Sequence, residues 1–310
     1  MFKKLMIAAA LLSFSVTASA EWTKGLSMGV SGSLESTNNN PQKVDGETIK
    51  LNGSIDGNYD YEAGNHAWKN SLIIRESLSK DTSLDEYVNS RDMLYFATEY
   101  QYAMPSMDWL KAYAKASVDT HIFKAETITA APVTYQGDST ATTNKLRTAD
   151  GFENMNIRLT VGVLAELINE ENTTLNGRLG FGAQQILADG ALRVEADGET
   201  VTALSDADSL GIEAGLYFDQ VLNEKSKLYA TIETFTPVDY NVDDAALEAK
   251  LDDKNEFELT DVTITAGLES EVTDWMSMRY SYEAKQTPFT NGSSFQVDHG
   301  FYITATYTVF

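Results

Sequence analysis

The chain has one serine and one histidine whose positions could support nucleophilic catalysis. Ser36 lies at the end of the first alternating segment and His299 lies in the last one, so closure of a sheet would make them neighbours. A serine nucleophile needs a histidine base in hydrogen-bond contact and a third group that orients it. No motif surrounds either residue, and a lipid-facing lipase or esterase site is therefore the alternative hypothesis rather than the main one. His66 and His121 are too isolated for a metal site, and we expect neither a metal nor a cofactor.

Charged residues of both signs recur at alternate positions, where a strand would place them on one face. They predict either an ion-paired network that fills the inside of a barrel or a narrow polar channel for small solutes, and the sequence leaves both open. A tight turn should set Asp60 directly opposite Lys69. The candidates for this inward face are Lys50, Asp56, Asp60, Lys69, Arg75, Lys111, Lys115, Arg158, Arg178, Glu213, Glu233, Arg279 and Glu283.

The elements that carry these residues alternate between apolar and polar side chains with a period of two. The pattern is clearest in Glu47–Glu62 and in Phe295–Phe310, which runs to the last residue. It predicts an all-β fold of about twelve strands. The expected strands are Trp22–Ser36, Glu47–Glu62, Ala67–Lys80, Asn89–Ala103, Trp109–Phe123, Asn156–Ile168, Thr173–Leu187, Leu210–Asp219, Lys227–Val238, Leu259–Val272, Trp275–Thr287 and Phe295–Phe310.

Short and long connections alternate along the chain. The short ones include Ala63–His66 and Asn169–Asn172, and the long ones include Lys124–Met155 and Ala188–Ser209. Short turns at one end and longer loops at the other are typical of a transmembrane, antiparallel, up-and-down β-barrel. Four tryptophans start strands at the short-turn end, which predicts a membrane girdle there: Trp22, Trp68, Trp109 and Trp275.

The long connections carry local patterns of their own. Ala191–Leu204 reads as a hairpin around Asp197 and Gly198, which could be a loop hairpin or an extra strand pair. Asp243–Leu251 reads as a short helix, while Lys124–Asp150 has no period and could cover or plug the barrel. The acids Asp243, Asp244, Glu248, Asp252, Asp253 and Glu256 could bind divalent cations, although a solvated acidic loop fits their spacing better.

The first residues predict export. Residues 1–20 combine a basic start, an apolar run and a small-residue cleavage site, so we expect a signal peptide and a single barrel domain over residues 21–310. The chain contains no cysteine, so no disulfide supports it. Its formal net charge of −23 argues against nucleic acid as a partner.

Three segments resemble known barrels: Trp22–Gly25, His66–Ile74 and Trp109–Ser117. Together they are similar to the uncharacterised and salt-induced families of outer-membrane β-barrels of Gram-negative bacteria. The resemblance implies an outer-membrane location but no catalytic or ligand residue. The aromatic end of Phe295–Phe310 resembles the signal that the barrel-assembly machinery reads, and outer-membrane lipids and lipopolysaccharide are the other expected partners.

Overall fold

The computed structural model describes most of the chain: residues 21–37, 46–81, 88–134, 142–188, 190–194, 201–243, 251, 254–289 and 292–308. The expected signal peptide, residues 1–20, lies outside the described residues. Within the described part no helix is long and apolar enough to cross a membrane.

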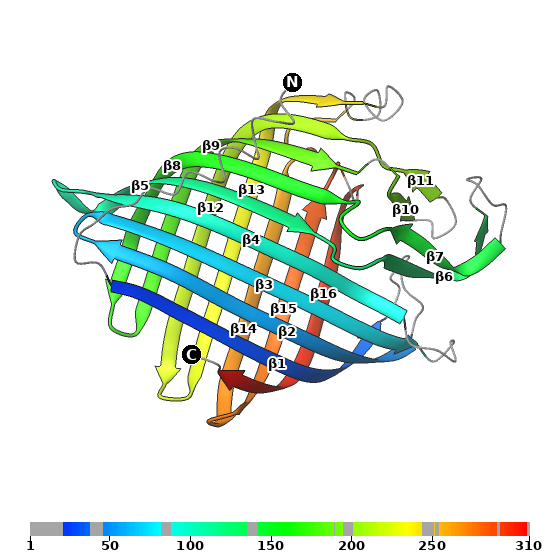
Figure 1. Cartoon of the computed structure of the whole chain (residues 1–310), viewed down its shortest axis with the longest axis horizontal. Coiled ribbons are helices and arrows are strands. Elements are labelled where there is room, and N and C mark those ends of the chain that lie inside the picture. Colours follow the sequence, from blue (N-terminus) through cyan, green and yellow to red (C-terminus); the bar gives the residue numbers. More distant parts are fainter. Residues whose placement is uncertain are drawn as a thin grey trace.

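Twelve antiparallel strands close into one barrel, as the alternating segments predicted (Figure 1). Its order is β1, β16, β15, β14, β13, β12, β9, β8, β5, β4, β3, β2 and back to β1. The strands are β1 (Glu21–Thr37), β2 (Gly46–Ala63), β3 (His66–Asp81), β4 (Val88–Met104), β5 (Met107–Thr120), β8 (Met155–Glu170), β9 (Thr173–Leu187), β12 (Ala207–Asn223), β13 (Ser226–Val242), β14 (Asp261–Thr273), β15 (Met276–Thr287) and β16 (Gly292–Thr308).

The first and last strands pair with each other, which confirms the expected closure. Their ladder runs from Ser27 opposite Thr308 to Leu34 opposite Phe301. Because closure pairs both edges of the sheet, it leaves no open edge along these residues. The ends of some strands differ from the prediction: β5 stops at Thr120 instead of Phe123, and Trp275 lies in the turn before β15.

The outer wall of the barrel is apolar. Neighbouring residues of a strand point to opposite faces, so one set of alternate positions faces outward along every strand. Large exposed apolar side chains follow this set around the barrel: Met28, Leu51, Phe96, Val161, Phe181, Ile212, Ile232, Leu268, Tyr280 and Phe301.

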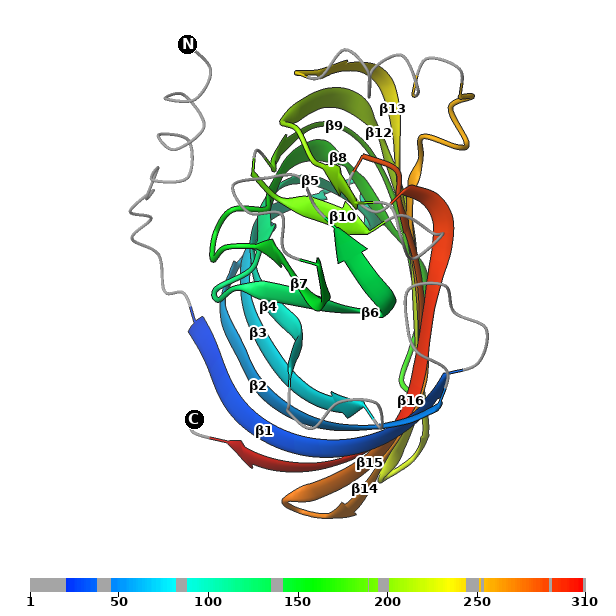
Figure 2. The same ribbon diagram turned by 90° about the vertical axis from the view of Figure 1, so that its right-hand side faces the viewer.

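The long connections hold two further hairpins at one end of the barrel. One pairs β6 (Ala125–Thr134) with β7 (Thr142–Ala149), and the other pairs β10 (Leu192–Val194) with β11 (Val201–Ala203). Figures 1 and 2 together show both hairpins across the mouth at that end. The segment Ala191–Leu204 is thus a loop hairpin and not an extra strand pair of the barrel. The segment Lys124–Asp150, in which the sequence showed no period, contains β6 and β7, which pair with each other.

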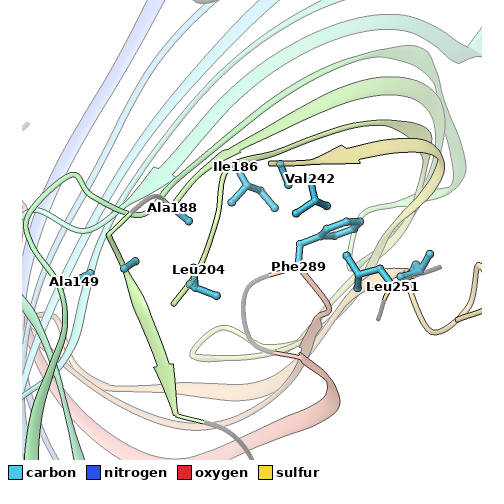
Figure 3. Packing of buried hydrophobic residues seen from close by; sticks show 10 residues of the cluster. Ala149, Ile186, Ala188, Leu204, Val242, Leu251 and Phe289 are labelled. Atoms are coloured by element: carbon cyan, nitrogen blue, oxygen red, sulfur yellow. The ribbon is translucent and has the colours of Figure 1, made fainter. Parts of the chain in front are cut away.

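An apolar cluster closes part of this mouth. Inward positions at the ends of β9, β12 and β13 supply Ile186, Ala207 and Val242, and the connections pack against them (Figure 3). Figure 3 shows Phe289 pointing toward Val242, beside Leu251. The complete cluster is Ala149, Ile186, Ala188, Ala191, Leu204, Ala207, Val242, Leu251, Leu259 and Phe289. Of the expected helix Asp243–Leu251, residues 244–250 lie outside the described part.

Candidate functional site: a polar network across the barrel interior

Arg178 on β9 forms an ion pair with Glu99 on β4, and its Nη2 lies 2.6 Å from Glu99 Oε2. Two strands, β8 and β5, separate β9 from β4 in the wall. The two side chains can meet only by crossing the interior. Both are about nine-tenths buried, with side-chain exposures of 9% and 11%.

A second carboxylate, Glu213 on β12, joins the same network. Its Oε1 accepts a hydrogen bond from Tyr113 Oη at 3.0 Å, and its Oε2 accepts one from Thr160 Oγ1 at 3.0 Å. Arg178 Nη1 lies 3.7 Å from Glu213 Oε1. Side chains from β5, β8 and β9 therefore converge on one carboxylate that is only 5% exposed. A buried charge requires such partners.

Glycines on the inner wall make room for the aromatic rings of this network. A Cβ at Gly180 would lie 2.5 Å from Tyr113 Oη, so only glycine lets this ring lie against β9. The guanidinium of Arg178 then lies 4.6 Å from the centre of the Tyr113 ring and 5.3 Å from that of Tyr217. Tyr217 in turn donates to Glu233 Oε1 at 2.6 Å, which extends the network to β13.

A second link crosses the interior between β8 and β14. Arg158 Nη2 lies 2.8 Å from Asp261 Oδ2, and Gln184 Nε2 donates to the same oxygen at 3.0 Å. The Arg158 guanidinium lies 4.5 Å from the centre of the Phe235 ring. Phe235 is 1% exposed and occupies the space that Gly211 leaves, where a Cβ would meet its Cζ at 2.8 Å.

Along β2 and β3, the inward side chains are more exposed to solvent than those of the network. Asp56 pairs with Arg75 across adjacent strands at 2.5 Å, and their side chains are 42% and 26% exposed. Asn58 on β2 and Lys69 on β3 are exposed as well. We call the inward face of β1, β2 and β3 the open half, and that of β4, β5, β8, β9, β12 and β13 the closed half. Ser77 and Ser79 are buried near the long-connection end of β3, so the open half narrows there.

The register of β2 and β3 agrees with the expected placement of Asp60 opposite Lys69, but among the described residues the two side chains form no ion pair. The pairs Asn58–Ser71 and Tyr61–Trp68 have the register that was expected. However, Asp60 Oδ1 accepts from the Asn70 backbone N–H at 3.0 Å, and Asp60 Oδ2 accepts from Asn58 Nδ2 at 3.2 Å. These two hydrogen bonds hold the Asp60 carboxylate against the Asn70 backbone and the Asn58 side chain, and not against the Lys69 ammonium group. Lys69 instead lies opposite Glu99, at the border between the two halves.

The other charged candidates lie at inward positions of the same registers. Lys111 pairs with Glu166 on the adjacent β8 at 2.5 Å. The Arg279 guanidinium lies 5.4 Å from the Tyr302 ring centre. Lys50, Lys115 and Glu283 lie opposite Ser79, Glu99 and Asp298, respectively.

Several network members were not among the sequence candidates: Tyr113, Thr160, Gln184, Tyr217, Phe235 and Asp261. Only their inward position in the alternating pattern could have indicated them.

The four tryptophans lie at the short-turn end of the barrel. Trp22 stacks on Tyr59 with ring centres 4.4 Å apart, and Trp68 Nε1 donates to Thr98 Oγ1 at 2.6 Å. Trp109 and Trp275 are more than half exposed, at 51% and 59%. Their role as a membrane girdle stays a prediction.

Among the described residues, no third group orients His299 as a serine hydrolase would require. The ladder between β1 and β16 ends at Leu34 and Phe301, and two further steps in the same register would set Ser36 opposite His299. His299 is exposed and forms no hydrogen bond with any residue that the structure describes, while the side chain of Ser36 lies outside the description. No group of three or more His, Asp or Glu among the described residues could hold a metal ion. Of the acidic-loop residues, Asp244, Glu248, Asp252 and Asp253 lie outside the described part.

No protein-family model matches the chain, and no curated protein matches its sequence. The resemblance to the salt-induced families thus stays a prediction. Among solved structures, the chain is similar to an outer membrane channel from Pseudomonas putida F1, with 10% identity and a TM-score of 0.44 over 95% of this chain and 100% of the other. It is also similar to the translocator domain of the autotransporter NalP from Neisseria meningitidis, with 13% identity and a TM-score of 0.41 over 99% and 94%. No function is transferred from either.

Proposed function

We propose that this protein is an outer-membrane β-barrel that offers small hydrophilic solutes a narrow, off-centre passage. The membrane location is supported by the closed wall and its apolar outer face. A bilayer requires every backbone polar group of a spanning sheet to be paired, and a closed barrel meets that requirement. Lipids and lipopolysaccharide are then its surroundings, and Phe295–Phe310 is the segment offered to the assembly machinery.

The passage is supported by the contrast in burial between the two halves of the interior. In the closed half, the side chains of Arg178 and Glu99 are only 9% and 11% exposed, because the network covers them. In the open half, the Asp56 side chain is 42% exposed although it lies inside the wall. Water therefore reaches the Asp56–Arg75 pair of the open half more readily than the buried Arg178–Glu99 pair of the closed half.

The chemistry of the open half favours hydrated solutes. Asp56 and Arg75 contact each other across adjacent strands and do not bridge the interior. The same half carries hydroxyl and amide groups, including Asn52, which donates to Ser31 Oγ at 3.3 Å. Such a surface can exchange hydrogen bonds with passing water and polar solutes.

The test is single-channel conductance of the refolded protein in a planar bilayer. We expect small, discrete current steps. Asn58→Cys should react with a water-soluble thiol reagent and lose current, whereas Thr160→Cys should react far more slowly because the site is 3% exposed. A folded barrel that carries no current would show that the protein is a structural envelope barrel.

A further inference from the structure

We propose that Arg178 is the strut that separates the closed half from the open half, and that it sets both the width and the ion preference of the passage. This inference rests on the proposed channel function. The proposed channel function does not by itself assign any role to Arg178.

The position of the Arg178–Glu99 pair supports the role of a strut. Glu99 lies on β4, directly opposite Lys69 on β3, and β3 belongs to the open half. Arg178 reaches this border from β9, on the far side of β8 and β5. Its contact of 2.6 Å with Glu99 therefore holds a buried guanidinium at the border between the closed half and the open half. The link between Arg158 and Asp261 joins β8 to β14 and does not reach β4.

The strut is held in place from several directions. The rings of Tyr113 and Tyr217 lie 4.6 Å and 5.3 Å from its guanidinium carbon, and Glu213 lies 3.7 Å from Nη1. Gln101 Nε2 donates to Glu99 Oε1 at 2.5 Å, so the acceptor is fixed as well. A flat guanidinium clamped between rings and carboxylates is a rigid wall element, which a lysine could not replace.

The charges around the strut support a role in ion preference. Arg178 contacts two carboxylates, Glu99 and Glu213, and Tyr217 connects it to a third, Glu233. Removing Arg178 leaves these carboxylates without the guanidinium that faces them. Carboxylates that line a pore attract cations. Loss of Arg178 should thus both widen the passage and favour cations.

The experiment compares Arg178→Met with Lys111→Met in planar bilayers. Lys111 is the matched control: it is an inward cation of the closed half, but its partner Glu166 lies on the adjacent strand. We expect Arg178→Met to raise the single-channel conductance and to shift the reversal potential in a KCl gradient toward K⁺. Lys111→Met should shift the reversal potential in the same direction without the gain in conductance.

A second variant separates width from charge. Arg178→Lys keeps the charge but replaces the planar guanidinium between the two rings with a flexible ammonium group, so it should raise conductance with little shift of the reversal potential. It also provides a test if Arg178→Met fails to fold. If the conductance of both Arg178 variants is at or below that of Lys111→Met, the proposal that Arg178 limits the width of the passage is wrong. If the wild type carries no current, the channel function fails, and currents that appear only in the Arg178 variants would still support the strut.

Discussion

Glu213→Leu should destabilise the barrel strongly. The carboxylate accepts hydrogen bonds from Tyr113 and Thr160 and lies 3.7 Å from Arg178. Leucine has a similar volume, but it would leave the hydroxyl groups of Tyr113 and Thr160 without this acceptor. It would also remove one of the two carboxylates that face the positive charge of Arg178. Removing one partner of a buried charged group costs about 3–5 kcal/mol, because the remaining partners stay buried. We expect a loss of this size in the free energy of unfolding.

The measurement is urea unfolding in lipid vesicles, followed by tryptophan fluorescence. The matched control is Glu166→Leu, which removes an inward glutamate from the ion pair with Lys111. The side chains of that pair are 23% and 26% exposed, so solvent can replace the lost contact, and the expected cost is about 0–1 kcal/mol. Equal losses of unfolding free energy in Glu213→Leu and Glu166→Leu would refute the reasoning, because burial would then not determine the cost of removing an inward glutamate.

Two further predictions test the packing and the orientation. Phe235→Ala should lower the free energy of unfolding by about 3–5 kcal/mol, because the ring is 1% exposed and fills the space over Gly211, and urea unfolding measures this loss. Phe257→Ala, at a ring that is 85% exposed, should leave stability nearly unchanged, and a similar loss in both would contradict the packing. In an outer-membrane barrel the short turns face the periplasm and the long loops face the cell surface. A peptide tag within Ala188–Ser209 should therefore be labelled on intact cells, whereas a tag within Ala63–His66 should not. Labelling of both tags would contradict this orientation.

The sequence determined the strands, their faces and the barrel. Alternation shows which residues of a strand share a face, because the side-chain period of a strand is two. It places Arg178, Glu213 and Asp56 each on the polar, inward face of its own strand. Alternating connection lengths indicated antiparallel neighbours and two different ends. The two-faced pattern of Phe295–Phe310 indicated a closing strand, and the ladder between β1 and β16 confirms that closure. The faces of each strand are local information that a single segment carries, and the connection lengths are read along the chain without any long-range contact.

Only the tertiary structure decided which charged residues meet. Arg178 and Glu99 are 79 residues apart in sequence, and Arg158 and Asp261 are 103 apart. Their contacts depend on strand tilt, on the stagger of several ladders and on the direction of long side chains. Even for the nearby pair of Asp60 and Lys69 the outcome depended on competing donors, since the Asn70 N–H and the Asn58 side chain donate to the Asp60 carboxylate. The pattern along a strand tells which side chains point inward, but the opposite wall, which the sequence does not position, determines their partners.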